Sequence, residues 1–168
     1  DGQKMGKSLN NFITLEQVFT GNHELLEQPY NPMTIRFFIL QAHYRSTLDF
    51  SNEALKAADK GLKRMLSAAE ILNKLKSSEK STVDIESWKN KCYEAMNDDF
   101  NSPVTIAHLF DAVRMINSIN DGKDSITPDD LTLLKKTFLT FIFDVLGLKN
   151  EKESSPENEA LVEGLMQT

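Results

Sequence analysis

Two lysines near the start of the 168-residue chain have a spacing that suits action on one polyphosphate. Lys4 and Lys7 lie in a short segment that Gly2 and Gly6 make flexible. Phosphoryl and adenylyl chemistry leaves a protein mainly the tasks of positioning and charge stabilisation, which two ammonium groups can perform. The segment therefore predicts a phosphate-binding loop.

The glycine spacing excludes one kind of phosphate loop. A P-loop has the pattern G-x-x-x-x-G-K-[ST], in which successive backbone N–H groups surround the phosphates. Here only three residues separate Gly2 from Gly6, one fewer than that pattern requires. We therefore reject the P-loop interpretation.

The order of residues in the loop supports another interpretation. The residues are Lys4, Met5, Gly6, Lys7 and Ser8. They resemble the Lys-Met-Ser-Lys-Ser loop of class I aminoacyl-tRNA synthetases, with Gly6 in place of a serine. The Leu-Gly-Asn-Phe pattern that often follows is also matched, with Asn10 in place of glycine. Gly6 removes a hydroxyl donor and adds backbone freedom, which affects how well the loop is preorganised.

Three later segments make the resemblance more specific. They are Ile35-Arg36-Phe37-Phe38-Ile39-Leu40, His43-Tyr44-Arg45-Ser46 and Met96-Asn97-Asp98-Asp99-Phe100-Asn101-Ser102-Pro103. Their order and spacing resemble cysteinyl-tRNA synthetase, and the last segment is similar to one in the helical anticodon-binding domain of that family. The resemblance extends from residue 2 to about residue 148.

This resemblance implies an activity and its partners. In the family the loop closes over ATP while cysteine is adenylated, so Lys4 and Lys7 would neutralise charge on the departing pyrophosphate. The family also needs a Rossmann-type domain, a His-Ile-Gly-His-like motif and a zinc ion for the substrate thiolate, none of which we find in this sequence. We therefore expect a C-terminal fragment that binds the tRNA for cysteine, holds no metal and is inactive without its N-terminal catalytic domain.

The charge distribution limits where nucleic acid could bind. The formal net charge of −6 argues against a generally basic nucleic-acid binder. However, residues 1–76 hold ten basic and eight acidic residues, whereas residues 77–168 hold nine and seventeen. A phosphate-binding surface should therefore lie in the first half of the chain.

Cysteine content and hydropathy narrow the class of protein. Cys92 is the only cysteine, which excludes an intramolecular disulfide and leaves no zinc cluster. No apolar run approaches membrane-spanning length, and we expect no signal peptide at the start. We expect a soluble, cytoplasmic protein with no membrane partner, and a monomer.

The spacing of apolar residues predicts an all-α protein. We expect a lysine loop and stem-contact region at 1–50, an antiparallel helical bundle at 51–148, and a flexible acidic linker with a weak terminal helix at 149–168. Helices are expected at about 14–19, 31–44, 51–75, 84–97, 103–119 and 127–148. The residues expected to cap them are Thr14, Asn31, Ser51, Asp84, Ser102 and Thr127.

Five basic residues are candidate tRNA contacts: Arg45, Lys56, Lys60, Lys63 and Arg64. The last four form a stripe on the expected helix 51–75, which is either a tRNA backbone contact or a solvated face balanced by Glu53 and Asp59. In the family, the region beyond the lysine loop lies against the inner corner of the tRNA, which makes Arg45 the preferred contact. Residues 43–45 could equally fasten the end of the preceding helix.

Other residues have weaker claims to function. Trp88 could stack on a base, although its place on an apolar stripe favours packing. Asp98 and Asp99 could bind a metal or act as acid and base, but we favour a structural role between two helices. Together with Arg114 they are weak candidates for reading the anticodon.

Two other functions fit parts of the sequence. One is a synthetase-like ligase that joins cysteine to an amino sugar, although the extended helices favour tRNA. The other is a helical protein-interaction module whose apolar residues in 156–167 dock on a partner. Only the first of these is an enzyme.

Overall fold

The computed structural model describes residues 4–9 and 11–149. Within these ranges the chain forms helices and no strand, as the apolar spacing predicted. The helices are η1 (Lys7–Leu9), α1 (Leu15–Thr20), α2 (Pro32–Leu40), α3 (Asn52–Leu72), α4 (Ile85–Asn97), α5 (Ser102–Asn120), α6 (Pro128–Leu139) and the π-helix η2 (Thr140–Val145). The expected linker and terminal helix lie outside the described residues, apart from Lys149.

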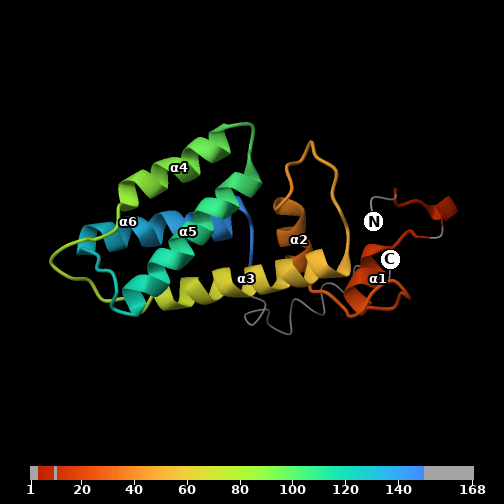
Figure 1. Ribbon diagram of the computed structural model, residues 1–168, viewed down its shortest axis with the longest axis horizontal. Helices are drawn as coiled ribbons and strands as arrows, with labels where there is room; N and C mark the ends of the chain where they lie inside the picture. Colours follow the sequence, from red (N-terminus) through yellow and green to blue (C-terminus); the bar gives the residue numbers. More distant parts are fainter. Residues whose placement is uncertain (1–3, 10, 150–168) are drawn as a thin grey trace, which may run out of the picture.

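Helices α3 to α6 form an up-and-down bundle in which successive helices run in alternate directions (Figure 1). Helix α5 packs on α3 and α4, and α6 packs on α4 and α3. Helix α2 packs on α3 at Gly61, where an added Cβ would lie 3.1 Å from the Phe37 ring and 3.4 Å from the Phe110 ring. The small residue therefore permits close packing on both sides of α3.

The core of the bundle follows the apolar seam expected on α3. All six residues of that seam are buried: Leu55, Ala58, Leu62, Met65, Ala69 and Leu72. They pack with apolar residues of the other helices, including Leu109 and Ile116 of α5 and Phe138 of α6. Burial of this apolar surface is the main favourable term for the fold.

Side-chain caps determine where most helices begin. Five expected caps each accept a backbone N–H: Thr14, Asn31, Ser51, Asp84 and Thr127. The sixth was assigned wrongly, because Asn101 caps α5 and Ser102 is already helical. The Ser102 hydroxyl instead donates to the carbonyl of Leu40, the last residue of α2, at 2.8 Å.

Two other helix predictions were wrong. Helix α2 ends at Leu40 rather than near Tyr44, and it is buried on one side only, because Ile39 is 52% exposed. The last helix does not continue regularly to Leu148, because it widens into η2 at Thr140. This π-helix shifts the buried face by one residue, so that Leu146 is buried in place of Val145.

Arg36 of α2 forms a hydrogen bond at the C-terminal end of η2. The Arg36 side chain donates from Nε to the Leu146 carbonyl at 2.7 Å. Gly147 follows with a φ of +62°, and an added Cβ there would lie 2.6 Å from an Arg36 nitrogen. Helix α2 is thus tied to the C-terminal end of the bundle as well as to α3.

Candidate nucleic-acid interface

Asn11 holds the lysine loop in shape. The Gly6 N–H donates to Asn11 Oδ1 at 2.8 Å, and Asn11 Nδ2 donates to the Lys4 carbonyl at 3.1 Å. The sequence motifs predicted no separate role for Asn11, although it belongs to the Leu-Gly-Asn-Phe-like segment that follows the loop. These bonds restrict the backbone around Gly6, where the loop departs from the usual serine.

The lysine loop itself is open to solvent. The side chains of Lys4, Met5, Lys7 and Ser8 are exposed, and Gly6 is partly buried. The Lys7 ammonium lies 5.5 Å from the centroid of the Phe12 ring. A hollow of about 440 Å³ adjoins this pair and is lined also by Thr14, Gln17, His23 and Glu24. A cation–π contact at an exposed site contributes only about 0.5–1 kcal/mol, so a phosphate could displace the ring.

Ion pairs and a ring contact occupy most of the basic stripe on α3. Lys56 pairs with Glu27, and the bond raises the pKa of the lysine. Lys63 donates to Asp59 at 2.7 Å, and Arg64 lies 5.7 Å from the centroid of the Phe110 ring. Lys60 is exposed and forms no ion pair with any residue that the structure describes. The stripe thus carries less uncompensated charge than its sequence indicates.

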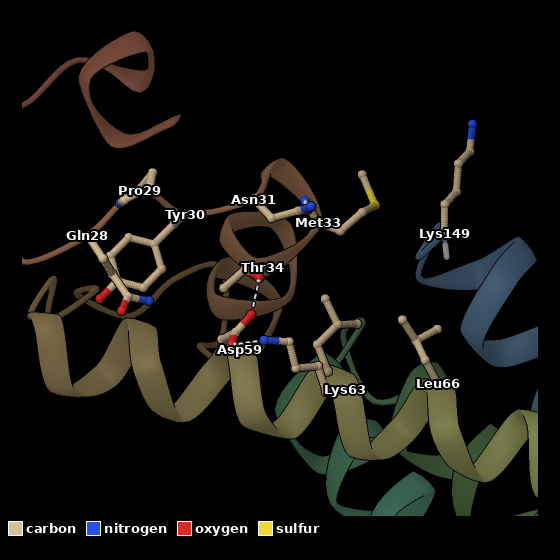
Figure 2. A pocket seen from close by; sticks show the side chains of 11 residues that line it. Gln28, Pro29, Tyr30, Asn31, Met33, Thr34, Asp59, Lys63, Leu66 and Lys149 are labelled. Atoms are coloured by element: carbon tan, nitrogen blue, oxygen red, sulfur yellow. Dashed lines mark hydrogen bonds and ion pairs between the residues drawn. The ribbon is translucent and has the colours of Figure 1, made fainter. Parts of the chain in front are cut away.

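A second hollow, of about 390 Å³, lies between α3 and the segment that leads into α2 (Figure 2). On its α3 side, Asp59 accepts from Thr34 at 3.1 Å and from Lys63 at 2.7 Å. Lys149 lies on another side of the same hollow (Figure 2). The bond from Thr34 to Asp59 attaches the first turn of α2 to α3. The bond from Lys63 to Asp59 occupies a lysine that we expected to contact RNA.

Residues 43–45 meet the turn between α4 and α5. The Tyr44 hydroxyl donates to Asp99 at 2.8 Å, and this bond raises the pKa of Tyr44. The Arg45 guanidinium lies 3.3 Å from the same carboxylate, and a His43 nitrogen lies 3.9 Å from it. Residues 43–45 are therefore fastened to Asp99, which lies far along the chain, as their expected structural role requires. The Arg45 side chain nevertheless remains largely exposed.

The described residues do not favour Trp88 as a base-stacking residue. Its side chain is 4% exposed, and its indole N–H donates to the His108 carbonyl at 2.7 Å. Arg114 is exposed and pairs with Asp111. Cys92 is buried, and burial raises the pKa of its thiol to about 12, so it is not a reactive thiolate.

Residues 4–9 and 11–149 contain no group of three or more His, Cys, Asp or Glu side chains that could hold a metal ion. In particular, Asp98 and Asp99 do not form such a group with their neighbours. Across the same ranges, every helix is too short or too polar to cross a membrane.

Two family models match separate parts of the chain. Residues 1–60 match the class I tRNA synthetase (C) catalytic domain, and residues 91–150 match the DALR domain. The first match ends within α3, and the second begins within α4. The first match therefore covers the lysine loop, α1, α2 and the start of α3, and the second covers the end of α4 with α5, α6 and η2; together these helices form one helical body.

Curated relatives are similar in sequence to nearly all of the chain. Cysteine–tRNA ligases of Parabacteroides distasonis, Bacteroides fragilis and Porphyromonas gingivalis are 61%, 59% and 56% identical over 92%, 95% and 92% of the chain. These alignments cover 32%, 33% and 32% of the relatives. The chain thus spans about a third of the length of the relatives it matches, and it belongs to the cysteine–tRNA ligase family.

Proposed function

We propose that the chain is the tRNA-binding part of a cysteine–tRNA ligase, an enzyme that activates cysteine with ATP and transfers it to the tRNA for cysteine. One observation carries the proposal: the catalytic-domain match and the DALR match lie at the two ends of one helical body, and α3 connects them. A chain with this arrangement can hold an ATP-binding loop at a fixed position relative to an RNA-binding bundle.

Within this proposal, Lys4 and Lys7 bind the phosphates of ATP, and Met5, Gly6 and Ser8 shape the loop between and beside them. Exposure of both lysines and the bonds from Asn11 support this role. ATP, when bound, supplies the adenylyl group that activates the cysteine carboxylate. Lys7 has to exchange its contact with Phe12 for a phosphate oxygen.

The described residues do not fit a zinc site, because they contain no suitable group of ligands and their one cysteine is buried. We place zinc, and the chemistry that depends on it, in a catalytic domain that would accompany this chain. The 168-residue chain alone is therefore expected to show no cysteine-dependent ATP–pyrophosphate exchange. We also propose that it acts in the cytoplasm as a monomer.

The proposed tRNA contacts are Arg45, Lys56, Lys60, Lys63 and Arg64. Lys60 and Arg64 are the strongest of the α3 residues, since neither forms an ion pair within the described part of the chain. Lys56 and Lys63 can still contribute, because exposed ion pairs contribute only about 0–1 kcal/mol and a phosphate can compete for the lysine.

Binding to two tRNAs tests this proposal. The affinity of the chain for a tRNA that accepts cysteine and for one that does not would be measured at about 50 and about 200 mM salt. We expect selective binding that weakens with salt, with a slope of about 0.7–0.9 in log affinity per neutralised phosphate. Equal affinity for both tRNAs, or no binding, would contradict the proposal.

A further inference from the structure

We infer that the 43–45 segment and the turn between α4 and α5 form one RNA contact, in which Arg45 binds a phosphate and Phe100 stacks on an unpaired base. We call this surface the junction patch; its residues are His43, Tyr44, Arg45, Asp99 and Phe100. The inference rests on the proposed function and locates one contact with the RNA.

The backbone of the turn holds Phe100 in an unfavourable conformation. Asp99 and Phe100 have φ values of +54° and +53°, and they are the non-glycine residues with positive φ in the described ranges. This left-handed conformation is unfavourable for residues that carry a side chain. Backbone bonds from Phe100 to Met96 and from Asn101 to Ala95, both 3.2 Å, hold the turn in place. Such strain persists where the surrounding structure enforces it, and it is common at binding sites.

Packing within the chain does not explain the position of the Phe100 ring. Its side chain is 71% exposed, whereas Phe37, Phe138 and Phe141 are buried in the core. Burial of a phenylalanine ring stabilises a fold, and the exposed Phe100 ring contributes little in this way. An exposed flat ring on an ordered turn is available to stack on a planar ligand.

At Asp99, the residue before Phe100, the 43–45 segment presents a stack of planar groups. The rings of His43 and Tyr44 are stacked with centroids 4.8 Å apart, and the Arg45 guanidinium lies 5.2 Å from the Tyr44 centroid. Asp99 accepts from Tyr44 and lies 3.3 Å from one Arg45 nitrogen. An arginine has five N–H donors, so others remain for a phosphate.

The composition of the junction patch favours RNA over a protein partner. Unpaired nucleotides are bound by stacking on aromatic rings and arginine planes, with a cation on the backbone. A protein contact of this size is expected to have a mostly apolar centre, whereas Arg45, Asp99 and His43 make this patch polar. The carboxylates of Asp98 and Asp99 disfavour a run of phosphates, so the patch suits one unpaired nucleotide rather than a duplex backbone.

Substitution of Phe100 tests the stacking contact. Phe100→Leu keeps an apolar side chain but removes the aromatic ring, and it should weaken binding of the 168-residue chain to the tRNA for cysteine by about 5- to 150-fold. Phe100→Tyr keeps the ring and should bind like the unaltered chain. Circular dichroism and the urea midpoint would verify that both variants fold.

Substitution of Arg45 tests the phosphate contact against a matched control. Arg45→Gln should lower the affinity and reduce the salt slope by about 0.7. Lys123→Gln is the control, because Lys123 is 73% exposed, Arg45 is 69% exposed, and each pairs with an aspartate. Lys123 follows the C-terminal end of α5, whereas the junction patch adjoins its N-terminal end, so this control should change neither quantity.

The outcomes separate this inference from the proposed function. If the unaltered chain binds the tRNA selectively but Phe100→Leu and Arg45→Gln bind equally well, the inference is overturned and the proposed function stands. If the unaltered chain binds no tRNA, both are overturned. Weakened binding by Phe100→Leu and Arg45→Gln, with unchanged binding by Phe100→Tyr and Lys123→Gln, supports the junction patch.

Discussion

The first fifty residues and the bundle differ in how they are held together. In α3, α4, α5 and α6, apolar residues of successive turns are buried against neighbouring helices. In the first fifty residues, many large apolar side chains are exposed: Met5, Leu9, Phe12, Leu15, Phe19, Leu25, Ile39, Tyr44 and Leu48. The bundle is thus stabilised by its own core, whereas much of the preceding region is not.

Polar contacts attach the preceding region to the bundle. The Asn52 side chain donates to the Leu25 carbonyl at 2.8 Å and accepts from the Glu27 N–H at 3.1 Å. Tyr30 is buried and donates its hydroxyl to the Asn52 carbonyl at 3.4 Å. The same kind of substitution therefore has very different consequences for stability in the two regions.

The largest expected effect is on the free energy of unfolding, and it is seen by comparing one alanine substitution in each region. Phe138→Ala removes a fully buried ring from α6 and should lower the free energy of unfolding by about 3–5 kcal/mol. Leu15→Ala removes a side chain that is 62% exposed on α1 and should change it by less than about 0.5 kcal/mol. Urea unfolding followed by circular dichroism measures both. Similar values for the two variants would show that the regions do not differ as described.

A smaller effect is expected where α2 is tied to the end of the bundle. Gly147→Ala forces an alanine into a positive φ and directs its Cβ at Arg36, which disturbs the bond to Leu146. Gly122→Ala is the matched control, because Gly122 has a φ of +72° with no atom within 4 Å of the added Cβ. Both should pay the cost of about 1–2 kcal/mol for a left-handed alanine.

Gly147→Ala should lose about 1 kcal/mol more than Gly122→Ala in thermal or urea unfolding, because it also weakens the Arg36 bond. Equal losses would show that the Arg36 contact adds nothing measurable to stability.

The smallest effect concerns a carboxylate between two loops. Ser118 and Thr82 donate to Asp124 at 2.6 and 2.8 Å, and these bonds lower the pKa of its carboxyl group. Because the folded pKa lies below the unfolded value of about 3.9, the stabilisation is present above that pH and is lost as pH falls through the folded pKa.

Asp124→Asn should therefore lower the urea midpoint slightly at pH 7, and the difference from the unaltered chain should shrink below about pH 4. A difference that stays constant across this pH range would show that the charge of Asp124 is not the cause.

Local signals in the sequence predicted much of the fold. The caps Thr14, Ser51 and Asp84 each accept from a residue three positions later, so short patterns suffice to identify them. The seam on α3 follows from helical periodicity alone. Ser102 was misassigned because the left-handed turn at Asp99 and Phe100 starts α5 one residue early, and no local pattern indicates that turn.

Contacts between distant residues were not predictable from the sequence. The partner of Tyr44 is Asp99, 55 positions later, and the partner of Arg36 is Leu146, 110 positions later. Arg36 lies on α2 and its acceptor lies at the end of η2, so this bond depends on how distant parts of the chain fold together. The basic stripe was identified from residue types, whereas its ion pair with Glu27 depends on how the segment before α2 folds.

Hydrogen–deuterium exchange of the chain with and without the tRNA for cysteine most directly tests where the RNA binds. We expect slower exchange with tRNA at residues 41–49, at residues 97–101 and along the first half of α3. Exchange in α6 should not change. Protection confined to α6 and η2, or no change at saturating tRNA, would contradict the proposal that the junction patch and the basic stripe contact the RNA.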